Sequence, residues 1–432
     1  MQFYSTNHKS ENVGLEEAIF RGLPQDNGLY MPVAINPMTD DFFAKIDRMS
    51  FREISYEVSK RIIGDSVPHS VLREIVETAI NFDTPLVQVE DDMYCLELFH
   101  GPSHAFKDFG ARFMARLMSF YLQKTHKEIN ILVATSGDTG GAVALGFLNQ
   151  PGINVTILYP SGMVSNIQEK QLTTLGGNIT AIEIKGTFDD CQKLVKQAFL
   201  DSELTKKKNL SSANSINIAR LIPQSFYYYY AYSKLKAKGK PVSFSIPSGN
   251  FGNLTAGLIA KRMGLPVEKF VASTNVNNVI PEYLETGKFN PRPSVSTLSN
   301  AMDVGNPSNF ARMAALYENN VDKIREDVEG YYFTDEQTKE ALAKVYAESH
   351  YIMCPHTAVA YLGLKAHMDK KTKKESGVFL GTAHPAKFMD VIQEDIASHI
   401  VLPASLKVAM AKEKKSIQMA PDFRLLKDFL LK

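Results

Sequence analysis

Short apolar runs alternate with amphipathic segments of helical length through most of this 432-residue chain. The run "INILVATSG" (129–137) leads to "GGAVALGFLNQ" (140–150), and "VSFSIPSG" (242–249) leads to "NLTAGLIAKRMG" (253–264). Strands that alternate with helices of this length are typical of right-handed βαβ units and parallel sheets. The alternation therefore predicts an α/β protein.

The first part of the chain has a different pattern. Residues 1–85 are mostly helical in character and contain no clear strand run. A chain of this length divides into two or three domains. We therefore predict a helical N-terminal extension at 1–85, and two α/β domains with parallel sheets at 86–235 and 236–432.

The charge balance and the hydropathy exclude several classes of protein. The formal net charge is +1, so a polyanion such as a nucleic acid gains no long-range attraction. No apolar run approaches the ~18 residues of a membrane span, and the N-terminus lacks the pattern of a secretory signal. We expect a cytoplasmic protein with neither a nucleic-acid nor a membrane partner.

The cysteines and histidines show no metal-binding spacing. Cys95, Cys191 and Cys354 are far apart, as expected in a reducing compartment. His100 and His104 are separated by a Gly-Pro pair, so they do not share a helical face. We predict no metal site.

Two glycine-rich loops each join an apolar run to a helical segment. They are "ATSGDTGGA" (134–142) and "IPSGNFGNLTAG" (246–257), and neither matches a nucleotide-binding fingerprint. Converging backbone N–H groups and the dipole of the following helix would make each loop an anion cradle. The alternative is a tight turn in which glycine only permits a positive φ.

A third junction, "FLGTAHPAKF" (379–388), places Thr382 after an apolar run and a glycine. Its hydroxyl is expected to face the crevice where ligands bind at the carboxyl ends of parallel strands. His384 is interpreted as a hydrogen-bonded histidine in a turn, and Lys387 as a polar group without an assigned role. A tyrosine-rich segment, "QSFYYYYAYSKL" (224–235), is interpreted as a buried helix with its hydroxyls at the rim.

The segment "GPSHAFKDFGARF" (101–113) contains a lysine near a predicted helix start. Pro102 and Ser103 suit that start, with Ser103 as a candidate N-cap. Asp108 complements the helix dipole, whereas Lys107, flanked by aromatic residues, has its charged form disfavoured. A partly neutral lysine can attack a carbonyl to form a Schiff base. The alternatives for Lys107 are a surface pair with Asp108 or an extended side chain that keeps its charge in water.

A lysine for a carbonyl, a glycine cradle for a phosphate and a hydroxyl for a ring nitrogen together describe a pyridoxal 5'-phosphate (PLP) site. The chain resembles the bacterial and fungal threonine synthases among the fold-type II PLP enzymes, whose fold is tryptophan synthase β-like. Motifs that carry the resemblance include "EEAIFRGLPQDNGLYMP", "CLELFHGPSHAFKDFGARFM", "ATSGDTGGAV", "SSANSINIARLIPQ", "SGNFGNLTAGL", "TLSNAMDVGNPSNF" and "GTAHPAKF".

The resemblance implies roles for particular residues. Lys107 matches the Schiff-base lysine, and Thr382 matches the group that hydrogen-bonds the pyridine nitrogen. The loop that holds the cofactor phosphate is matched by Gly249, Asn250, Phe251 and Asn253. The residues expected to contact substrate are Ser136, Gly137, Asp138, Thr139, Asn214, Ser215 and Arg220. The last three are expected around the substrate phosphate, where an arginine suits bidentate binding.

The implied reaction converts O-phospho-L-homoserine and water to L-threonine and phosphate, the last step of threonine biosynthesis, in a monomer or homodimer. His104 departs from the leucine-like residue usual in the family. A PLP-dependent threonine or serine dehydratase, a related protein that binds PLP without turnover, and a phosphate-binding module without cofactor remain alternatives. Phosphate release from phosphohomoserine separates the first from a threonine synthase.

Overall fold

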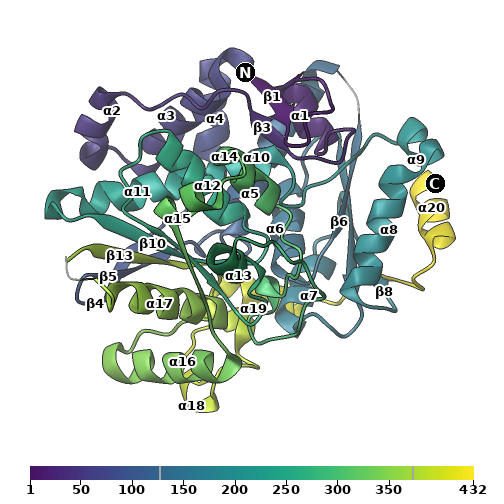
Figure 1. The fold of residues 1–432 in the computed structure, drawn as a ribbon. Helices are drawn as coiled ribbons and strands as arrows, with labels where there is room; N and C mark the ends of the chain where they lie inside the picture. Colours follow the sequence, from purple (N-terminus) through teal and green to yellow (C-terminus); the bar gives the residue numbers. More distant parts are fainter. Residues whose placement is uncertain (126–127, 372–373) are drawn as a thin grey trace.

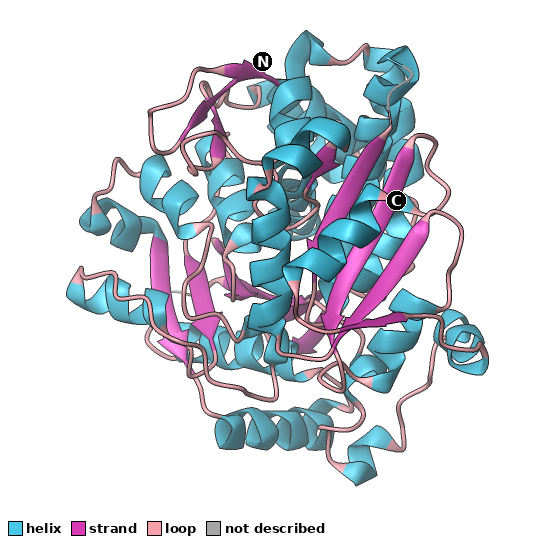
Figure 2. Cartoon of the chain, turned by 90° about the vertical axis from the view of Figure 1, so that its right-hand side faces the viewer, coloured by secondary structure: helices cyan, strands magenta, loops and turns pink. Residues whose placement is uncertain are grey.

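The computed structural model describes residues 1–125, 128–371 and 374–432 (Figure 1). Within these ranges the chain forms three sheets with helices packed around them. Two of the sheets are mainly parallel, and helices lie between and outside them (Figure 2). The α/β class predicted from the alternation of apolar and amphipathic segments is confirmed by this architecture.

The N-terminal part contains a small sheet as well as helices, so the prediction of no strand in residues 1–85 is wrong. Its strands pair antiparallel in the order β2-β1-β3 and are β1 (Gln2–Ser5), β2 (Val13–Gly14) and β3 (Tyr30–Pro32). They are too short to show an alternating pattern in the sequence. The helices are α1 (Leu15–Arg21), α2 (Asp40–Lys45), α3 (Phe51–Ile63) and α4 (His69–Ala79). Ser50 and Glu53 form a capping box at the start of α3.

The larger sheet has six strands in the order β12-β11-β10-β13-β5-β4. All pairs are parallel except β4 with β5. The strands are β4 (Leu86–Glu90), β5 (Met93–Glu97), β10 (Val242–Pro247), β11 (Phe270–Thr274), β12 (Val328–Tyr332) and β13 (Ser376–Gly381). Because helices cover both faces, β10, β11 and β13 are buried throughout and show no alternation.

The second parallel sheet has five strands in the order β14-β8-β7-β6-β9. They are β6 (Ile129–Ala134), β7 (Ile153–Pro160), β8 (Ile179–Ile184), β9 (Leu210–Ser211) and β14 (Ile417–Met419). Successive residues of β6 face different cores, because Ile131 and Val133 pack in the main core whereas Leu132 and Ala134 pack in a smaller one.

Helices fill the layers around the two parallel sheets. α17 lies along β13, β10, β11 and β12, and α16 packs against α17. α8 packs on β6 and β7, with α20 outside it, as Figure 1 shows on the right. These helices are α5 (Lys107–Thr125), α6 (Asp138–Phe147), α7 (Asn166–Thr173), α8 (Phe188–Leu200), α9 (Ser202–Lys207), α10 (Ile218–Leu221), α11 (Phe226–Leu235), α12 (Gly252–Arg262), α13 (Val279–Thr286), α14 (Phe310–Leu316), α15 (Val321–Asp327), α16 (Asp335–Ser349), α17 (Pro355–Met368), α18 (Glu394–Ala397), α19 (Ala404–Ala411) and α20 (Phe423–Leu431).

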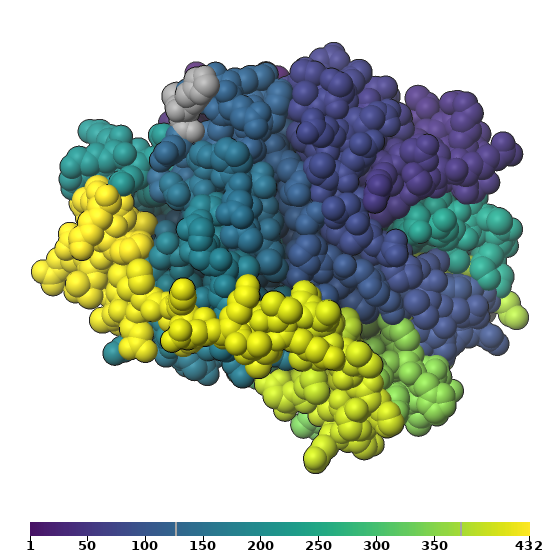
Figure 3. Space-filling view, turned by 180° about the vertical axis from the view of Figure 1, so that it is seen from behind, coloured from purple at the N-terminus to yellow at the C-terminus, as the bar shows by residue number. Residues whose placement is uncertain are grey.

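Membership of the sheets departs from the predicted division at two places. β4 and β5, placed in the 86–235 unit by the sequence, belong to the six-stranded sheet with β13. β14, near the C-terminus, pairs with β8 in the five-stranded sheet. The C-terminal segment thus crosses the back of the molecule, as the yellow band in Figure 3 shows. Strand pairing between distant segments leaves no local mark in sequence, so the predicted residue limits could not anticipate it.

The tyrosine-rich segment forms η3 (Ile222–Ser225) and α11, and is buried as predicted. The predicted position of its hydroxyls is wrong for three of them. Tyr227, Tyr228 and Tyr229 are buried, and their hydroxyls donate hydrogen bonds inside the protein. Tyr227 and Tyr228 share one acceptor, the Asn253 side-chain oxygen, at 2.5 and 2.7 Å. A buried hydroxyl needs such a partner to offset its desolvation.

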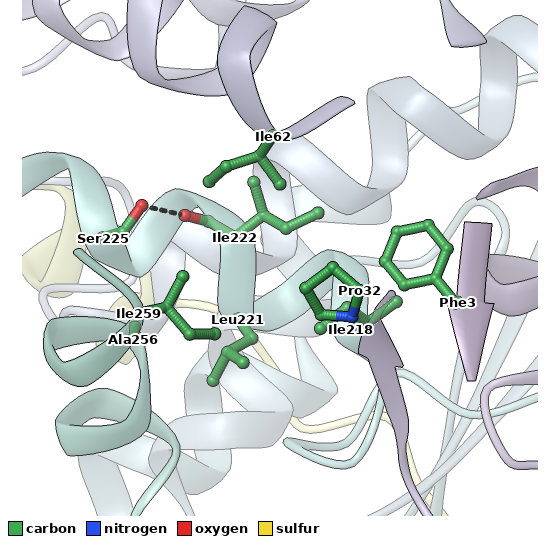
Figure 4. Close-up of a pocket in the computed structure, with 9 residues that line it drawn as sticks. All are labelled: Phe3, Pro32, Ile62, Ile218, Leu221, Ile222, Ser225, Ala256 and Ile259. Carbon is green, nitrogen blue, oxygen red and sulfur yellow. Dashed lines mark hydrogen bonds between the residues drawn. The ribbon is translucent and has the colours of Figure 1, made fainter. Parts of the chain in front are cut away.

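A small apolar cavity lies where the N-terminal part meets α10, η3 and α12 (Figure 4). Phe3, Ile62, Ile218 and Ile259 line it, and the hydroxyl of Ser225 beside it donates to the Ile222 carbonyl. The lining offers no free polar or ionisable group for chemistry. This cavity is therefore a packing feature of the domain junction.

Arg312 in α14 joins the N-terminal part to two loops of the α/β part. The side chain is fully buried and donates to the Tyr30 carbonyl at 3.0 Å and to the Ile216 carbonyl at 2.6 Å. It also donates to the Asn309 side-chain oxygen at 2.8 Å. Burial lowers the pKa of Arg312 to about 9, which still leaves it charged at neutral pH.

We expect Arg312→Met to lower the free energy of unfolding by about 3 kcal/mol, because it leaves buried carbonyls without donors. Urea unfolding followed by circular dichroism measures this loss. Arg262→Met is the matched control, since Arg262 donates one exposed hydrogen bond to the Leu316 carbonyl. Equal, small losses in the two variants would contradict the linking role of Arg312.

Candidate active site between the two parallel sheets

Three loops of the six-stranded sheet meet at one edge. β10, β13 and β5 are neighbours and run parallel, so the segments that follow them leave from the same side. After β5 the chain reaches Lys107, after β13 it reaches Thr382, and after β10 it forms the loop 248–253. The sheet thus brings together the lysine, the hydroxyl and one of the two glycine-rich loops that the sequence singled out.

The turn before α5 holds Lys107 next to Thr382. The Phe106 N–H donates to the Thr382 carbonyl at 2.9 Å, and Ala105 forms a bridge with Ala383. This pairing keeps residues up to 106 out of the helix, so α5 begins at Lys107 and the prediction of Ser103 as its N-cap is wrong. Asp108 lies in the first turn as predicted, and its carboxylate accepts from the Ser103 N–H at 2.8 Å.

Lys107 lies in a largely desolvated position. Its side chain is 16% exposed, and its Nζ is 4.0 Å from Asp138 Oδ2 and 5.3 Å from the Phe106 ring centre. Burial lowers the pKa of Lys107 to about 8, although the Asp138 carboxylate opposes this shift. Asp108 is fully buried, and burial raises its pKa to about 6. A Lys107–Asp108 surface pair is therefore excluded. A Lys107 amine that is partly neutral near pH 8 agrees with the prediction of a reactive lysine.

The other glycine-rich loop, at 134–142, approaches Lys107 from the five-stranded sheet. Gly137 has a φ of +144°, and a Cβ there would lie 2.7 Å from the Gln168 side chain, so only glycine fits. The Thr135 hydroxyl accepts from the Gly137 N–H at 3.0 Å and from the Gly140 N–H at 2.9 Å. Ser136 and Thr139 are half-buried on either side of the buried Asp138, at the start of α6.

The loop after β10 is a tight turn that leads directly into α12. Phe251 adopts a left-handed conformation with φ +60°, and α12 begins at the next residue. A Cβ at Gly249 would lie 2.9 Å from the Ala301 carbonyl oxygen. The Asn250 side-chain oxygen accepts from the Ser308 N–H at 3.3 Å. The N-terminus of α12 thus follows directly on a loop that Ala301 and Ser308 hold in place, and such a helix start can bind an anion.

Asn253 in the first turn of α12 has a fixed side-chain orientation. Its oxygen accepts from the hydroxyls of Tyr227 and Tyr228, so its amide nitrogen points away from them. That nitrogen is buried and has no partner among the described residues. An unpartnered buried donor at a helix N-terminus fits a bound anion such as a phosphate.

The three residues predicted to bind the substrate phosphate are not all buried to the same degree. Ser215 is next to Gly252, whose Cβ would be 3.8 Å from the Ser215 Cβ, and Asn214 is half-buried beside it. Arg220 is buried and donates to the Ala213 carbonyl at 2.5 Å. Its Nε has no partner within the described parts of the chain. Arg220 is close enough to lower the pKa of Lys107 electrostatically.

Two polar contacts of the site were not anticipated. Lys387 is buried, and its Nζ lies 2.5 Å from Asp138 Oδ1. The Gln168 amide donates to the same oxygen at 2.9 Å. In the sequence analysis Lys387 had no assigned role. Its partner, Asp138, follows a strand of the other sheet, so only the three-dimensional structure reveals the contact. His384, in contrast, is a hydrogen-bonded turn residue as predicted, since its Nδ1 accepts from the Ala386 N–H at 3.1 Å.

The residues present fit PLP as a cofactor. A lysine amine is available for an aldehyde, a helix N-terminus with an unpartnered amide nitrogen for a phosphate, and the Thr382 hydroxyl for a ring nitrogen. In the residues that the structure describes, no cluster of three His, Cys, Asp or Glu side chains could hold a metal ion. No helix in the same ranges is both long and apolar enough to cross a membrane.

Comparisons with known families agree with this geometry. The model described as pyridoxal-phosphate dependent enzyme matches residues 78–382. Two further models, threonine synthase N terminus and threonine synthase C-terminal, match residues 2–80 and 357–430. Threonine synthase of Haemophilus influenzae is 43% identical over the whole length of both chains. That of Saccharomyces cerevisiae is 34% identical and covers 96% of this chain and 94% of its own.

Solved structures give the same result. Threonine synthase from Escherichia coli superposes with a TM-score of 0.91 at 42% identity, covering 100% of this chain and 99% of that one. A PLP-bound threonine synthase from Brucella melitensis superposes with a TM-score of 0.93 at 33% identity, with the same coverage. Maize serine racemase, at 15% identity, 73% coverage of this chain and a TM-score of 0.55, shares the fold. These matches confirm the predicted type II fold and the predicted cofactor, and the chain belongs to the threonine synthase family of PLP-dependent enzymes.

Proposed function

We propose that this chain converts O-phospho-L-homoserine and water to L-threonine and phosphate, with Lys107 as the residue that binds PLP covalently. The observation that carries the proposal is the position of the Lys107 amine. It is desolvated and lies at the same sheet edge as the cradle of residues 249–253, with a second glycine-rich helix start 4.0 Å away at Asp138. A substrate that carries both a carboxylate and a phosphate needs anion-binding groups beyond those that hold the cofactor.

The proposed cofactor-binding residues surround Lys107. When bound, PLP supplies an aldehyde for the lysine and a ring that accepts electrons from the substrate carbon. Gly249, Asn250, Phe251 and Asn253 would hold its phosphate, and the Thr382 hydroxyl would hydrogen-bond the ring nitrogen. Thr382 is 5% exposed, and the bond from the Phe106 N–H to its carbonyl keeps it adjacent to Lys107.

The chain's own proton chemistry centres on Lys107. With a pKa of about 8, its amine can hold a proton or release it near neutral pH. We propose that Lys107, once free of the cofactor, removes the proton from the substrate Cα and returns protons later in the reaction. The Lys107 side chain is only 16% exposed, which limits the access of bulk water to the reactive carbon.

On the substrate side, the Ser136–Thr139 loop is proposed to bind the carboxylate. Its N–H groups lie at the start of α6, where the helix dipole favours an anion. Asn214, Ser215 and Arg220 are proposed to contact the phosphate, supported by the unpartnered Nε of Arg220 within the described ranges. Free thiols at the three cysteines fit a cytoplasmic setting, and a monomer or homodimer would suffice because every proposed site residue comes from one chain.

The enzyme loaded with PLP is expected to release inorganic phosphate from O-phospho-L-homoserine and to form threonine in equal amount. Lys107→Ala should lower kcat by about a thousandfold or more, because both the covalent bond and the proton transfer are lost. Phosphate release and amino-acid analysis measure this. Lys196→Ala is the matched control, since Lys196 is exposed on α8. Ammonia release from threonine or serine, without phosphate release from phosphohomoserine, would instead support a dehydratase.

Asn253→Asp is expected to weaken PLP binding about tenfold to hundredfold, because a carboxylate replaces the amide nitrogen proposed to face the phosphate. Tyr227→Phe should weaken it less, since Tyr228 still orients Asn253. Tyr229→Phe is the matched control, because the Tyr229 hydroxyl bonds the Ala260 carbonyl instead. Titration of the apoprotein with PLP, followed by absorbance, gives the dissociation constants. Unchanged affinity in Asn253→Asp would rule out the proposed phosphate contact.

A further inference from the structure

Three ionisable side chains from separate elements meet beside the proposed reaction centre. Asp138 of α6 has one carboxylate oxygen 2.5 Å from Lys387 Nζ and the other 4.0 Å from Lys107 Nζ. The Lys387 side chain is completely buried, and that of Asp138 is 4% exposed. The Asp138 carboxylate thus lies between two lysines, and of the two only Lys387 contacts it closely.

Lys387 is also attached to the turn that sets the position of Lys107. It belongs to η6 (Pro385–Phe388) and donates to the Ser103 carbonyl at 2.9 Å. Ser103 in turn donates its N–H to Asp108 in the first turn of α5. The Gln171 amide donates to the same Ser103 carbonyl at 3.1 Å. The buried Lys387 ammonium needs the Asp138 carboxylate and the Ser103 carbonyl as acceptors, because it has no water to replace them.

The surroundings of Lys107, taken together, lower its pKa and so disfavour its charged form. Asp138 and Cys354 raise the pKa of Lys107, whereas Lys387 and Arg220 lower it, as does burial most of all. His356 lies close by, and burial lowers its pKa to about 4, so it adds no charge at neutral pH. Because Lys387 already neutralises Asp138, Lys107 has no counter-ion of its own among the residues that the structure describes. Without Lys387, Asp138 would become the direct counter-ion of Lys107.

We propose that Lys387 is a positioning residue of this active site, which engages the Asp138 carboxylate so that the Lys107 amine stays free to react. Attack on the aldehyde needs the neutral amine, since its lone pair forms the new bond to carbon. The carbonyl oxygen then leaves as water with the two protons of that amine. A Lys107 ammonium paired with Asp138 has no lone pair to supply.

The inference rests on the proposed role of Lys107, and its test uses the apoprotein and PLP without substrate. The rate of Schiff-base formation is measured by absorbance across pH 6 to about 10, a range that spans a lysine pKa of about 8. In Lys387→Met, the pH of half-maximal rate is expected to rise by about one unit or more, and the rate at pH 7 to fall about tenfold. Lys387→Arg keeps the charge and should leave the midpoint in place.

The double variant Asp138→Asn/Lys387→Met separates charge balance from packing. It removes both members of the buried pair, so the midpoint should return to that of the unaltered protein or below it. It should also fold if Lys387→Met alone fails to, since no unpaired buried charge remains. A midpoint that stays raised in the double variant, or one that does not move in folded Lys387→Met, would overturn the inference. If Lys387→Met and the double variant both fail to fold, a midpoint shifted in Lys387→Arg would overturn it and an unshifted one supports it.

Failure of the underlying proposal gives a different result. If PLP forms no Schiff base with the unaltered protein, or forms one that persists in Lys107→Ala, the role of Lys107 is wrong. An unshifted midpoint in Lys387→Met with normal Schiff-base formation at Lys107 would contradict only the role of Lys387.

Discussion

The parallel pairing of β5, β13 and β10 is the constraint on which the rest of the site depends. Because these strands run parallel, Lys107, Thr382 and the 248–253 loop all lie at one edge of the six-stranded sheet. The five-stranded sheet then supplies Asp138 from the opposite side, 4.0 Å from Lys107. A site between two sheets is enclosed by both, so desolvation shifts the pKa of Lys107 downward, and the positive charges of Lys387 and Arg220 add to this shift.

A second layer of buried polar contacts holds these loops in place. Tyr227 and Tyr228 orient Asn253, Arg312 links the Tyr30 carbonyl to the loop at 215–216, and Lys387 joins Asp138 to the Ser103 turn. Each buried polar group costs free energy unless it is satisfied. The N-terminal part therefore supports the site through Arg312, although it contributes none of the residues proposed to contact cofactor or substrate.

Local sequence patterns predicted the elements and the reactive groups, whereas non-local pairing decided how they assemble. Lys107 and both glycine-rich loops stand out within a few residues of sequence, because each combines unusual side chains with a helix start. Ser103 failed as a cap because the bond from Phe106 to Thr382, nearly three hundred residues away in sequence, delays the helix. The partner of Lys387 and the two different sheets that β5 and β14 join depend on similar long-range contacts, which no local pattern encodes.

We propose that Lys107, and no other lysine, forms the covalent bond to PLP. Borohydride reduction of the loaded protein makes that bond permanent, and peptide mapping by mass spectrometry locates the pyridoxyl group. The position of Lys387, 2.5 Å from Asp138, makes it the informative competitor. We expect a single modified peptide that carries the group on Lys107. A group on Lys387, or on any other residue, would contradict it.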